Sequence, residues 1–248
     1  MRTLGLIGGM SWESTALSYQ WINRGVRDRR GPLCSAHLLI DSLNFADIVA
    51  LQRAGDWTRA GEAMASSARR LQRAGAHGLL IATNTMHKVA AAVTDAVPLP
   101  FLHIADSTGH AIRAAGLDTV ALLGTAFTME DGFYQRYLRE KFDIHCLVPE
   151  AEQRREVHRV IFDELCAGIR CQTSRAMFCE AIAQLARQGA QAAILGCTEI
   201  ALLVEQSDSP IPVFDTTALH AAAAVEFCLA SNEGKSCAHP ASPASPPA

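Results

Sequence analysis

Three pairs of short apolar segments recur along the chain in the same order and at nearly constant spacing. The pairs are TLGLIGG at 3–9 with TVALLGT at 119–125, GLLIATNT at 78–85 with AAILGCTE at 192–199, and PLPFLHIAD at 98–106 with PIPVFD at 210–215. Matching positions lie 116, 114 and 112 residues apart, as for Gly8 and Gly124, Thr83 and Cys197, and Pro100 and Pro212. Three matches in register predict an internal duplication.

Helical patterns separate these strand-like segments. Strands are expected at 3–9, 37–41, 78–82 and 98–104, and helices from Ser11 to about Arg29, over 57–75, and from about Thr85 to Ala96. Strands that alternate with helices form parallel sheets covered on both faces. We therefore expect an α/β fold of two pseudo-symmetric, doubly wound parallel-sheet lobes, with the active site in the cleft between them, because ligands bind at the carboxyl ends of such strands.

The predicted first lobe covers residues 1–108 and is joined by a C-terminal helix at 216–230, and the second covers 109–215. Residues 231–248, rich in Pro, Ala and Ser, are expected to be a disordered tail.

Composition narrows the class of protein. The 248 residues carry a net charge of −3, which argues against a nucleic-acid partner, and no apolar run is long enough for a membrane span. The N-terminus does not resemble a signal peptide, and the eight cysteines include no C-x-x-C pair. We expect a cytoplasmic protein with reduced thiols, most of them buried. The three lysines, Lys88, Lys141 and Lys235, offer few Schiff-base candidates, which disfavours pyridoxal phosphate.

The two members of one repeated pair carry the candidate chemistry. Cys197 follows a buried strand and precedes a predicted helix, whose N-terminal field would lower the thiol pKa. Glu199 either acts on this thiol or caps the helix, and Cys197 itself is either functional or a packed core thiol. Thr83 occupies the matching turn, followed by Asn84 and Thr85, which suit either an anion site or an N-cap cluster.

Other motifs give weaker signals. The Gly8–Gly9 turn lacks the spacing of a dinucleotide or phosphate loop, although its amides could bind a carboxylate at the following helix start. His87 lies one helical turn beyond Thr83, where it either orients the site or lies at the surface. No metal-ligand spacing occurs, so no metal is predicted.

Together, these motifs and their order resemble those of the aspartate/glutamate racemase family, whose members need no cofactor. The motifs that carry the resemblance are Gly-Gly-Met-Ser-Trp-Glu-Ser-Thr at 8–15, Thr-Asn-Thr-Met-His-Lys at 83–88, Pro-Phe-Leu-His-Ile-Ala-Asp at 100–106, Leu-Leu-Gly-Thr with Thr-Met-Glu within 122–130, and Gly-Cys-Thr-Glu-Ile at 196–200. They span about residues 1–230. The nearest resemblance is to the branch described as L-aspartate/glutamate-specific or broad-specificity amino-acid racemases.

The resemblance implies two α/β lobes, a homodimer, and racemisation by two cysteines on opposite faces of the α-carbon. Those positions are Thr83 and Cys197 here, so one thiol is replaced by a hydroxyl. Threonine is a poor base, and we therefore expect kinetic asymmetry. Cys197 would deprotonate the L-amino acid efficiently, and the direction that starts at Thr83 would be slow.

The resemblance also implies substrate contacts near Met10, Gln52, Thr83, Asn84, Thr85, Thr125, Thr128 and Thr198. Cys166 and Glu199 are further candidate substrate contacts. Arg53, in a predicted polar loop, either pairs with a side-chain carboxylate or is exposed. No basic residue accompanies Cys166, where aspartate-selective relatives carry one, which leaves room for broader substrates.

Two other functions fit the same residues. One is an arylmalonate-type decarboxylase that uses a single cysteine, and the other is an amino-acid binding protein without catalysis. The intact motifs at 83–88 and 196–200 favour the racemase, which would act on a small amino acid and use no cofactor.

Overall fold

The computed structural model describes residues 1–230 and contains two four-stranded sheets in which all pairs are parallel. The first has the order β2-β1-β3-β4, from Leu38–Ser42, Leu4–Gly8, Gly78–Ile81 and Phe101–Leu102. The second has the order β6-β5-β7-β8, from His145–Leu147, Thr119–Gly124, Ala192–Gly196 and Val213–Asp215. The repeated segments thus occupy equivalent strands, and the predicted two-lobe α/β fold is confirmed. The expected disordered tail lies outside the described residues.

Equivalent strands also pair in the same register. Ile7 of β1 lies opposite Ile81 of β3, and Leu123 of β5 lies opposite Leu195 of β7. All four residues are buried, because helices cover both faces of each sheet. The turns that follow β1 and β3 therefore lie side by side at one edge of the first sheet. The turns that follow β5 and β7 lie side by side at the equivalent edge of the second sheet.

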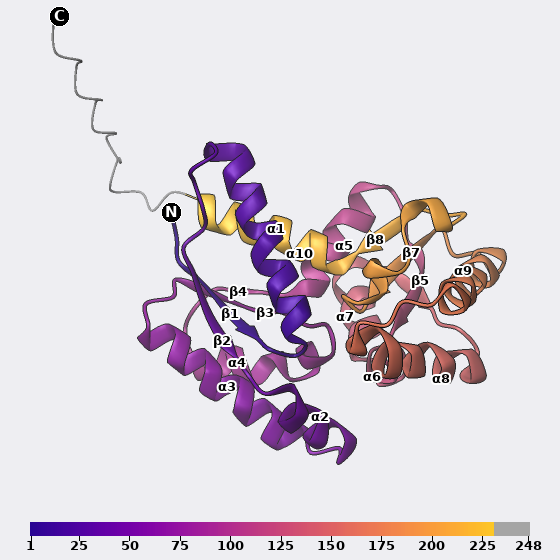
Figure 1. Ribbon diagram of the computed structural model, residues 1–248, viewed down its shortest axis with the longest axis horizontal. Helices are drawn as coiled ribbons and strands as arrows, with labels where there is room; N and C mark the ends of the chain where they lie inside the picture. The colour runs from indigo at the N-terminus through magenta and orange to yellow at the C-terminus, as the bar shows by residue number, and fades with distance from the viewer. Residues whose placement is uncertain (231–248) are drawn as a thin grey trace, which may run out of the picture.

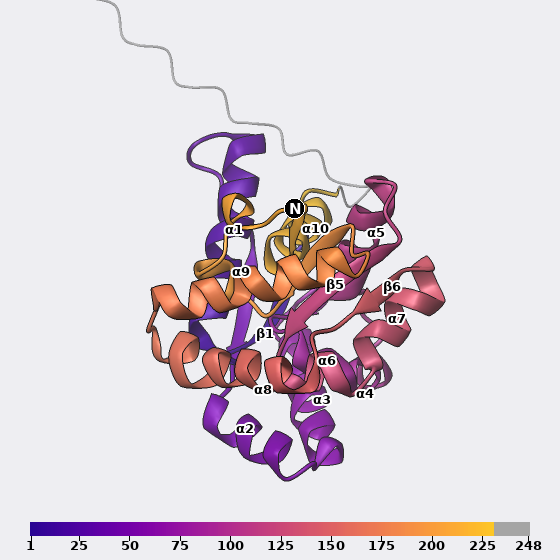
Figure 2. The same ribbon diagram turned by 90° about the vertical axis from the view of Figure 1, so that its right-hand side faces the viewer.

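Each sheet is enclosed by two helical layers (Figures 1 and 2). On the first sheet, α1 (Trp12–Arg30) and α10 (Thr216–Leu229) pack on one face, and α3 (Trp57–Arg73) and α4 (Ala90–Ala96) on the other, beside α2 (Phe45–Arg53) and the 3₁₀ turn η1 (Thr85–Val89). On the second sheet, α5 (Ile104–Ala114) and α7 (Phe133–Phe142) oppose α8 (Ala151–Arg159) and α9 (Gln172–Arg187). Shorter segments complete this lobe: α6 (Ala126–Glu130), η2 (Val160–Glu164), η3 (Leu165–Ala167), η4 (Ile200–Leu202) and η5 (Gln206–Asp208).

The last helix of each repeat crosses to the other lobe. Helix α5 follows β4 of the first sheet but buries Ile104 and Ile112 against the second. Helix α10 follows β8 of the second sheet but buries Ala224 and Val225 against the first. The two helices also pack on each other (Figure 1). This reciprocal exchange ties the lobes together. The proposed boundary at residue 108 falls inside α5 and stays a prediction.

Three local predictions were wrong. The segment before Trp57 is helix α2 rather than a polar loop, because Ile48 and Gln52, one turn apart, are both buried. The predicted strand at 98–104 is reduced to Phe101–Leu102, since His103 caps α5. Only the three-residue turn η4 follows the β7 loop, where a helix was expected. Within residues 1–230, no helix has the length and apolar character needed to span a membrane.

The core of the first lobe yields a stability test. Leu6 is fully buried in the layer that α1 and α10 form over the first sheet, whereas Leu33 is 99% exposed. Truncation of Leu6 leaves a cavity in a close-packed core, so Leu6→Ala is expected to lower the free energy of unfolding by about 2–5 kcal/mol. The matched change Leu33→Ala should alter it by less than about 0.5 kcal/mol. Urea denaturation followed by circular dichroism measures both, and equal losses would contradict this account of the core.

Candidate active site

A small cavity lies where the carboxyl ends of the two sheets meet. Its free volume is about 30 Å³, enough to hold water. Polar groups come from the turns after β3, β5 and β7 and from α2: Gln52, Thr83, Asn84, Thr85, Thr125, Cys197, Thr198 and Glu199. The remaining wall is largely apolar: Met10, Phe45, Ile161, Phe162, Cys166 and Gly196. Both lobes therefore contribute to one enclosed site.

The turn after β3 is held from behind by His87. The Nδ1–H of this buried histidine donates to the Thr83 carbonyl at 2.8 Å, and its Nε2 accepts from the Ile104 amide at 3.1 Å. A ring that donates at one nitrogen and accepts at the other is the neutral tautomer. His87 therefore orients the Thr83 turn, and the surface position considered for it from sequence was wrong.

Asn84 connects this turn to the second lobe. Its Nδ2 donates to Thr216 Oγ1 at 2.9 Å, and the Thr216 hydroxyl donates in turn to the Leu195 carbonyl at 2.9 Å. The Asn84 Oδ1 is buried and has no hydrogen-bond partner among residues 1–230. A buried acceptor without a partner is costly.

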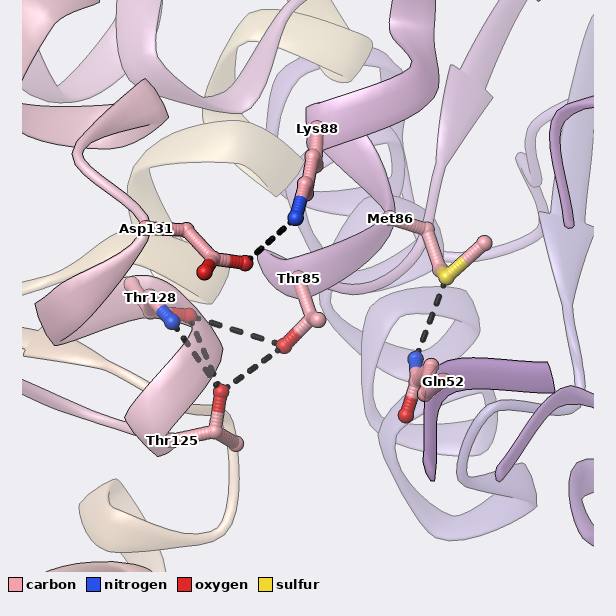
Figure 3. A network of polar contacts seen from close by, with 7 residues as sticks. All are labelled: Gln52, Thr85, Met86, Lys88, Thr125, Thr128 and Asp131. Atoms are coloured by element: carbon pink, nitrogen blue, oxygen red, sulfur yellow. Dashed lines mark hydrogen bonds and ion pairs between the residues drawn. The ribbon is translucent and has the colours of Figure 1, made fainter. Parts of the chain in front are cut away.

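The hydroxyl of Thr85 meets two hydroxyls from the second lobe (Figure 3). It lies 3.0 Å from Thr125 Oγ1 and 3.5 Å from Thr128 Oγ1. Beside them, Lys88 Nζ contacts Asp131 Oδ2 at 2.6 Å, so an ion pair also joins η1 to the end of α6. On the first-lobe side, Gln52 Nε2 contacts Met86 Sδ at 3.1 Å. The contacts of Thr85 and Lys88 with the second lobe hold the lobes closed around the cavity.

Cys197 begins the turn after β7, and its thiol is protonated at rest. Burial raises the pKa of this thiol well above its usual range, and the nearby Glu199 carboxylate and the Cys166 thiol raise it further. Its Sγ donates to Glu199 Oε2 at 2.9 Å. The lowered pKa predicted from a helix N-terminus was therefore wrong, because the following turn is short and burial outweighs it.

Glu199 is buried as a carboxylate between the two lobes. Its Oε1 accepts from the Ser11 and Ser14 hydroxyls, both at 2.7 Å. Its Oε2 accepts from Cys197 and, at 2.6 Å, from Thr198 Oγ1. Burial alone would raise the pKa of Glu199, but these four hydrogen bonds outweigh it and the net pKa is lowered. Ser11 is the N-cap of α1, whose N-terminus further favours a negative charge.

The turn after β1 brings these serines into place. Gly9 has a φ of 85°, and a Cβ there would lie 2.1 Å from the Leu43 carbonyl oxygen. Glycine is therefore required for the tight turn between β1 and α1. The sequence predicted that amides at this helix start could bind a carboxylate. In the structure the Glu199 carboxylate lies there, but it accepts from the serine hydroxyls.

Most of the residues predicted from sequence line the cavity, with two exceptions. Thr128 lies behind Thr125, and Arg53 is exposed and outside the lining. Phe45, Ile161 and Phe162 were not anticipated, because they belong to helical segments rather than to the turns after strands. The expectation of mostly buried thiols was also wrong for the described residues: Cys228 is buried, whereas six other cysteines are partly exposed.

Outside the cavity, the buried His87 and His220 and the half-buried His103 cluster behind the Thr83 turn. The His87 ring centroid lies 4.5 Å from that of His103 and 5.9 Å from that of His220. Burial lowers the pKa of both His103 and His220 to about 4, and that of His87 well below its usual value. In residues 1–230, no group of three potential ligands is arranged to hold a metal ion.

Comparison with known proteins agrees with this geometry. Residues 7–224 match the sequence model of the family described as Asp/Glu/Hydantoin racemase. A Yersinia pestis protein crystallised as a candidate Asp/Glu racemase is 47% identical over 93% of this chain and 100% of its own, with a TM-score of 0.87. An aspartate racemase homologue from Pyrococcus horikoshii is 31% identical over 92% and 99%, with a TM-score of 0.79.

Arylmalonate decarboxylase is a more distant match. It is 17% identical over 92% of this chain and 93% of its own, with a TM-score of 0.51, and so shares the fold alone. The fold and the enclosed polar site thus define an isomerase of the amino-acid racemase class. The chain belongs to the Asp/Glu/Hydantoin racemase family.

The contact between Cys197 and Glu199 yields a titration test. Replacement of the carboxylate by an amide removes a negative charge that raises the thiol pKa. In Glu199→Gln the pKa of Cys197 is expected to fall by about one unit or more. Thiolate absorbance at 240 nm, taken as the difference from the same chain carrying Cys197→Ser, measures it. Glu150→Gln, at an exposed position, is the control, and an unchanged Cys197 titration in Glu199→Gln would contradict the assignment.

The histidine cluster predicts sensitivity to acid. The unfolded chain takes up protons near pH 6.5, whereas His103 and His220 stay neutral in the fold down to about pH 4. The free energy of unfolding should therefore keep its full value above pH 6.5. It should fall as the pH is lowered from 6.5 to 4, by on the order of 3 kcal/mol for each histidine. Urea midpoints across this range measure the slope. His220→Gln should flatten it, and the exposed His145→Gln should not.

Proposed function

We propose that this protein interconverts L- and D-amino acids, of the Asp/Glu type or broader, without pyridoxal phosphate, and that Cys197 and Thr83 act on opposite faces of the α-carbon. The observation that carries the proposal is their placement. They occupy equivalent turns after β7 and β3, one in each lobe, and both line the same enclosed cavity.

In this proposal, the Cys197 thiolate removes the α-proton of the L-amino acid. The Cα–H bond breaks, an S–H bond forms, and the electron pair spreads into the α-carboxylate. Hydroxyl and amide donors such as Thr85, Thr125 and Gln52 are available to stabilise this charge. A proton is returned to the opposite face from the Thr83 hydroxyl. The Thr83 alkoxide is then reprotonated from solvent, and Glu199 releases to solvent the proton that it took from the thiol.

The thiol must first lose its own proton. Glu199 Oε2 already accepts the S–H hydrogen bond and is the nearest base for that step. A substrate ammonium group in the cavity would favour the thiolate, because an opposite charge nearby lowers a thiol pKa. Glu199 and the bound substrate would therefore activate Cys197 together.

Thr83 makes the two directions unequal. Its hydroxyl donates a proton readily enough to complete the L-to-D direction but is a poor base for the reverse. The equilibrium constant of racemisation is one in an achiral solvent, so the kcat/KM values of the two directions must be equal. The asymmetry is therefore kinetic and appears in kcat and KM taken separately.

We also infer a cytoplasmic homodimer. The seven described cysteines are free thiols, which suits a reducing compartment. The dimer rests on the resemblance to the racemase family.

Exchange of the α-hydrogen in heavy water, followed by NMR, tests the proposal. Cys197→Ser should slow exchange from L-amino acids by about 10²- to 10⁴-fold, the range that general bases contribute. Cys171→Ser, at a thiol outside the cavity lining, is the control. Thr83→Cys should speed exchange from the D-enantiomer, because a thiol replaces a poor base.

Four outcomes would count against this function. Full activity in Cys197→Ser would remove the thiol from the mechanism, and an unchanged D-exchange in Thr83→Cys would remove Thr83. Carbon dioxide release from aryl malonates, without amino-acid exchange, would favour the decarboxylase. Tight binding without exchange would favour a binding protein.

A further inference from the structure

The cavity walls carry an unbalanced charge. Glu199 is the single ionisable carboxyl group among the described lining residues, and none of them is arginine, lysine or histidine. Hydrogen bonds keep this carboxylate ionised. The site therefore holds one negative charge before any substrate enters.

Nearby cations are not free to balance a second carboxylate. Lys88 is paired with Asp131 at 2.6 Å, and its Nζ lies 3.8 Å from the centroid of the Trp57 ring. Arg53 is exposed and outside the lining. Neither side chain reaches the cavity in this closed arrangement.

Glu199 itself has no acceptor capacity left for a substrate. A carboxylate offers about four acceptor positions, and four are taken by Ser11, Ser14, Cys197 and Thr198. Asn84, which keeps an unpaired Oδ1, is neutral. It therefore offers a carboxylate no opposite charge.

The wall left for the substrate side chain is apolar. Phe45 of α2 stacks with Phe162 of η2 across the two lobes, with ring centroids 6.4 Å apart and an angle of 17° between the planes. Ile161 and Met10 adjoin them in the lining. A side-chain carboxylate buried here would lose its hydration and gain no charged partner.

We propose that the site takes an α-amino acid with a neutral side chain and discriminates against aspartate and glutamate. This inference rests on the racemase function proposed above. A zwitterion with a neutral side chain adds no net charge, whereas a dicarboxylic amino acid adds a second buried negative charge beside Glu199. Proton removal by the thiolate increases the penalty, because it shifts the negative charge from sulfur onto the α-carbon and α-carboxylate, closer to a side-chain carboxylate.

Matched substrates isolate this effect, since asparagine and glutamine have the shapes of aspartate and glutamate without the charge. With the full-length wild-type protein in heavy water, kcat/KM for α-hydrogen exchange should be at least about tenfold higher for L-Asn than for L-Asp, and for L-Gln than for L-Glu. Equal rates, or faster exchange of the acidic member, would overturn the proposal. No exchange of any of the four would instead count against the racemase function.

A charge introduced into the lining provides a second test. Cys166 lines the cavity and is half-buried, so a longer side chain has a route toward solvent. Cys166→Lys should raise the ratio of Asp to Asn exchange by at least about tenfold relative to Cys166→Met, which adds similar length without charge. An equal ratio in the two folded variants would overturn the proposal. Circular dichroism establishes that both variants are folded.

Discussion

The buried carboxylate of Glu199 is the group on which the rest of the site depends. It accepts from Ser11 and Ser14 at the start of α1, and from Cys197 and Thr198 in the turn after β7. One side chain therefore joins the lobes, places a negative charge at the N-terminus of a long helix and raises the pKa of the candidate base, Cys197. Closure of the cavity and the protonation state of its thiol are consequently coupled through a single charge.

The surrounding architecture keeps this arrangement rigid. Because α5 and α10 each cross to the opposite lobe, neither sheet has a complete core without a helix that follows the other sheet. Behind the Thr83 turn, His87 uses both ring nitrogens on backbone groups, and its neutral form is favoured by burial. The turns that face the cavity are thus held from both sides, as the proposed stabilisation of a carbanion would require.

Much of the fold and part of the site could be predicted from sequence. The spacing between Thr83 and Cys197 reflected equivalent strands, because duplicated strands keep their order and register. The turn residues followed, since parallel strands present their carboxyl ends at one edge. The segment before Trp57 could not be assigned as a helix, because the burial of Ile48 and Gln52 depends on packing against distant parts of the first lobe. Phe45 and Phe162 were missed for the same reason: helical side chains that meet across a cleft leave no pattern along the chain.

The sequence by itself determined the duplication, the two parallel sheets and the residue types at the two facing turns, because these depend on local periodicity and on the chemistry of single side chains. Tertiary structure alone decided the state of those side chains. A helix start would lower the pKa of the Cys197 thiol. Burial raises this pKa instead, and so does the Glu199 carboxylate, which accepts a hydrogen bond from the other lobe. The described cavity lining contains no cationic side chain, and this too depends on which segments the fold brings together. Solvation and charge balance arise from the whole environment of a group, and no segment of the chain contains that environment.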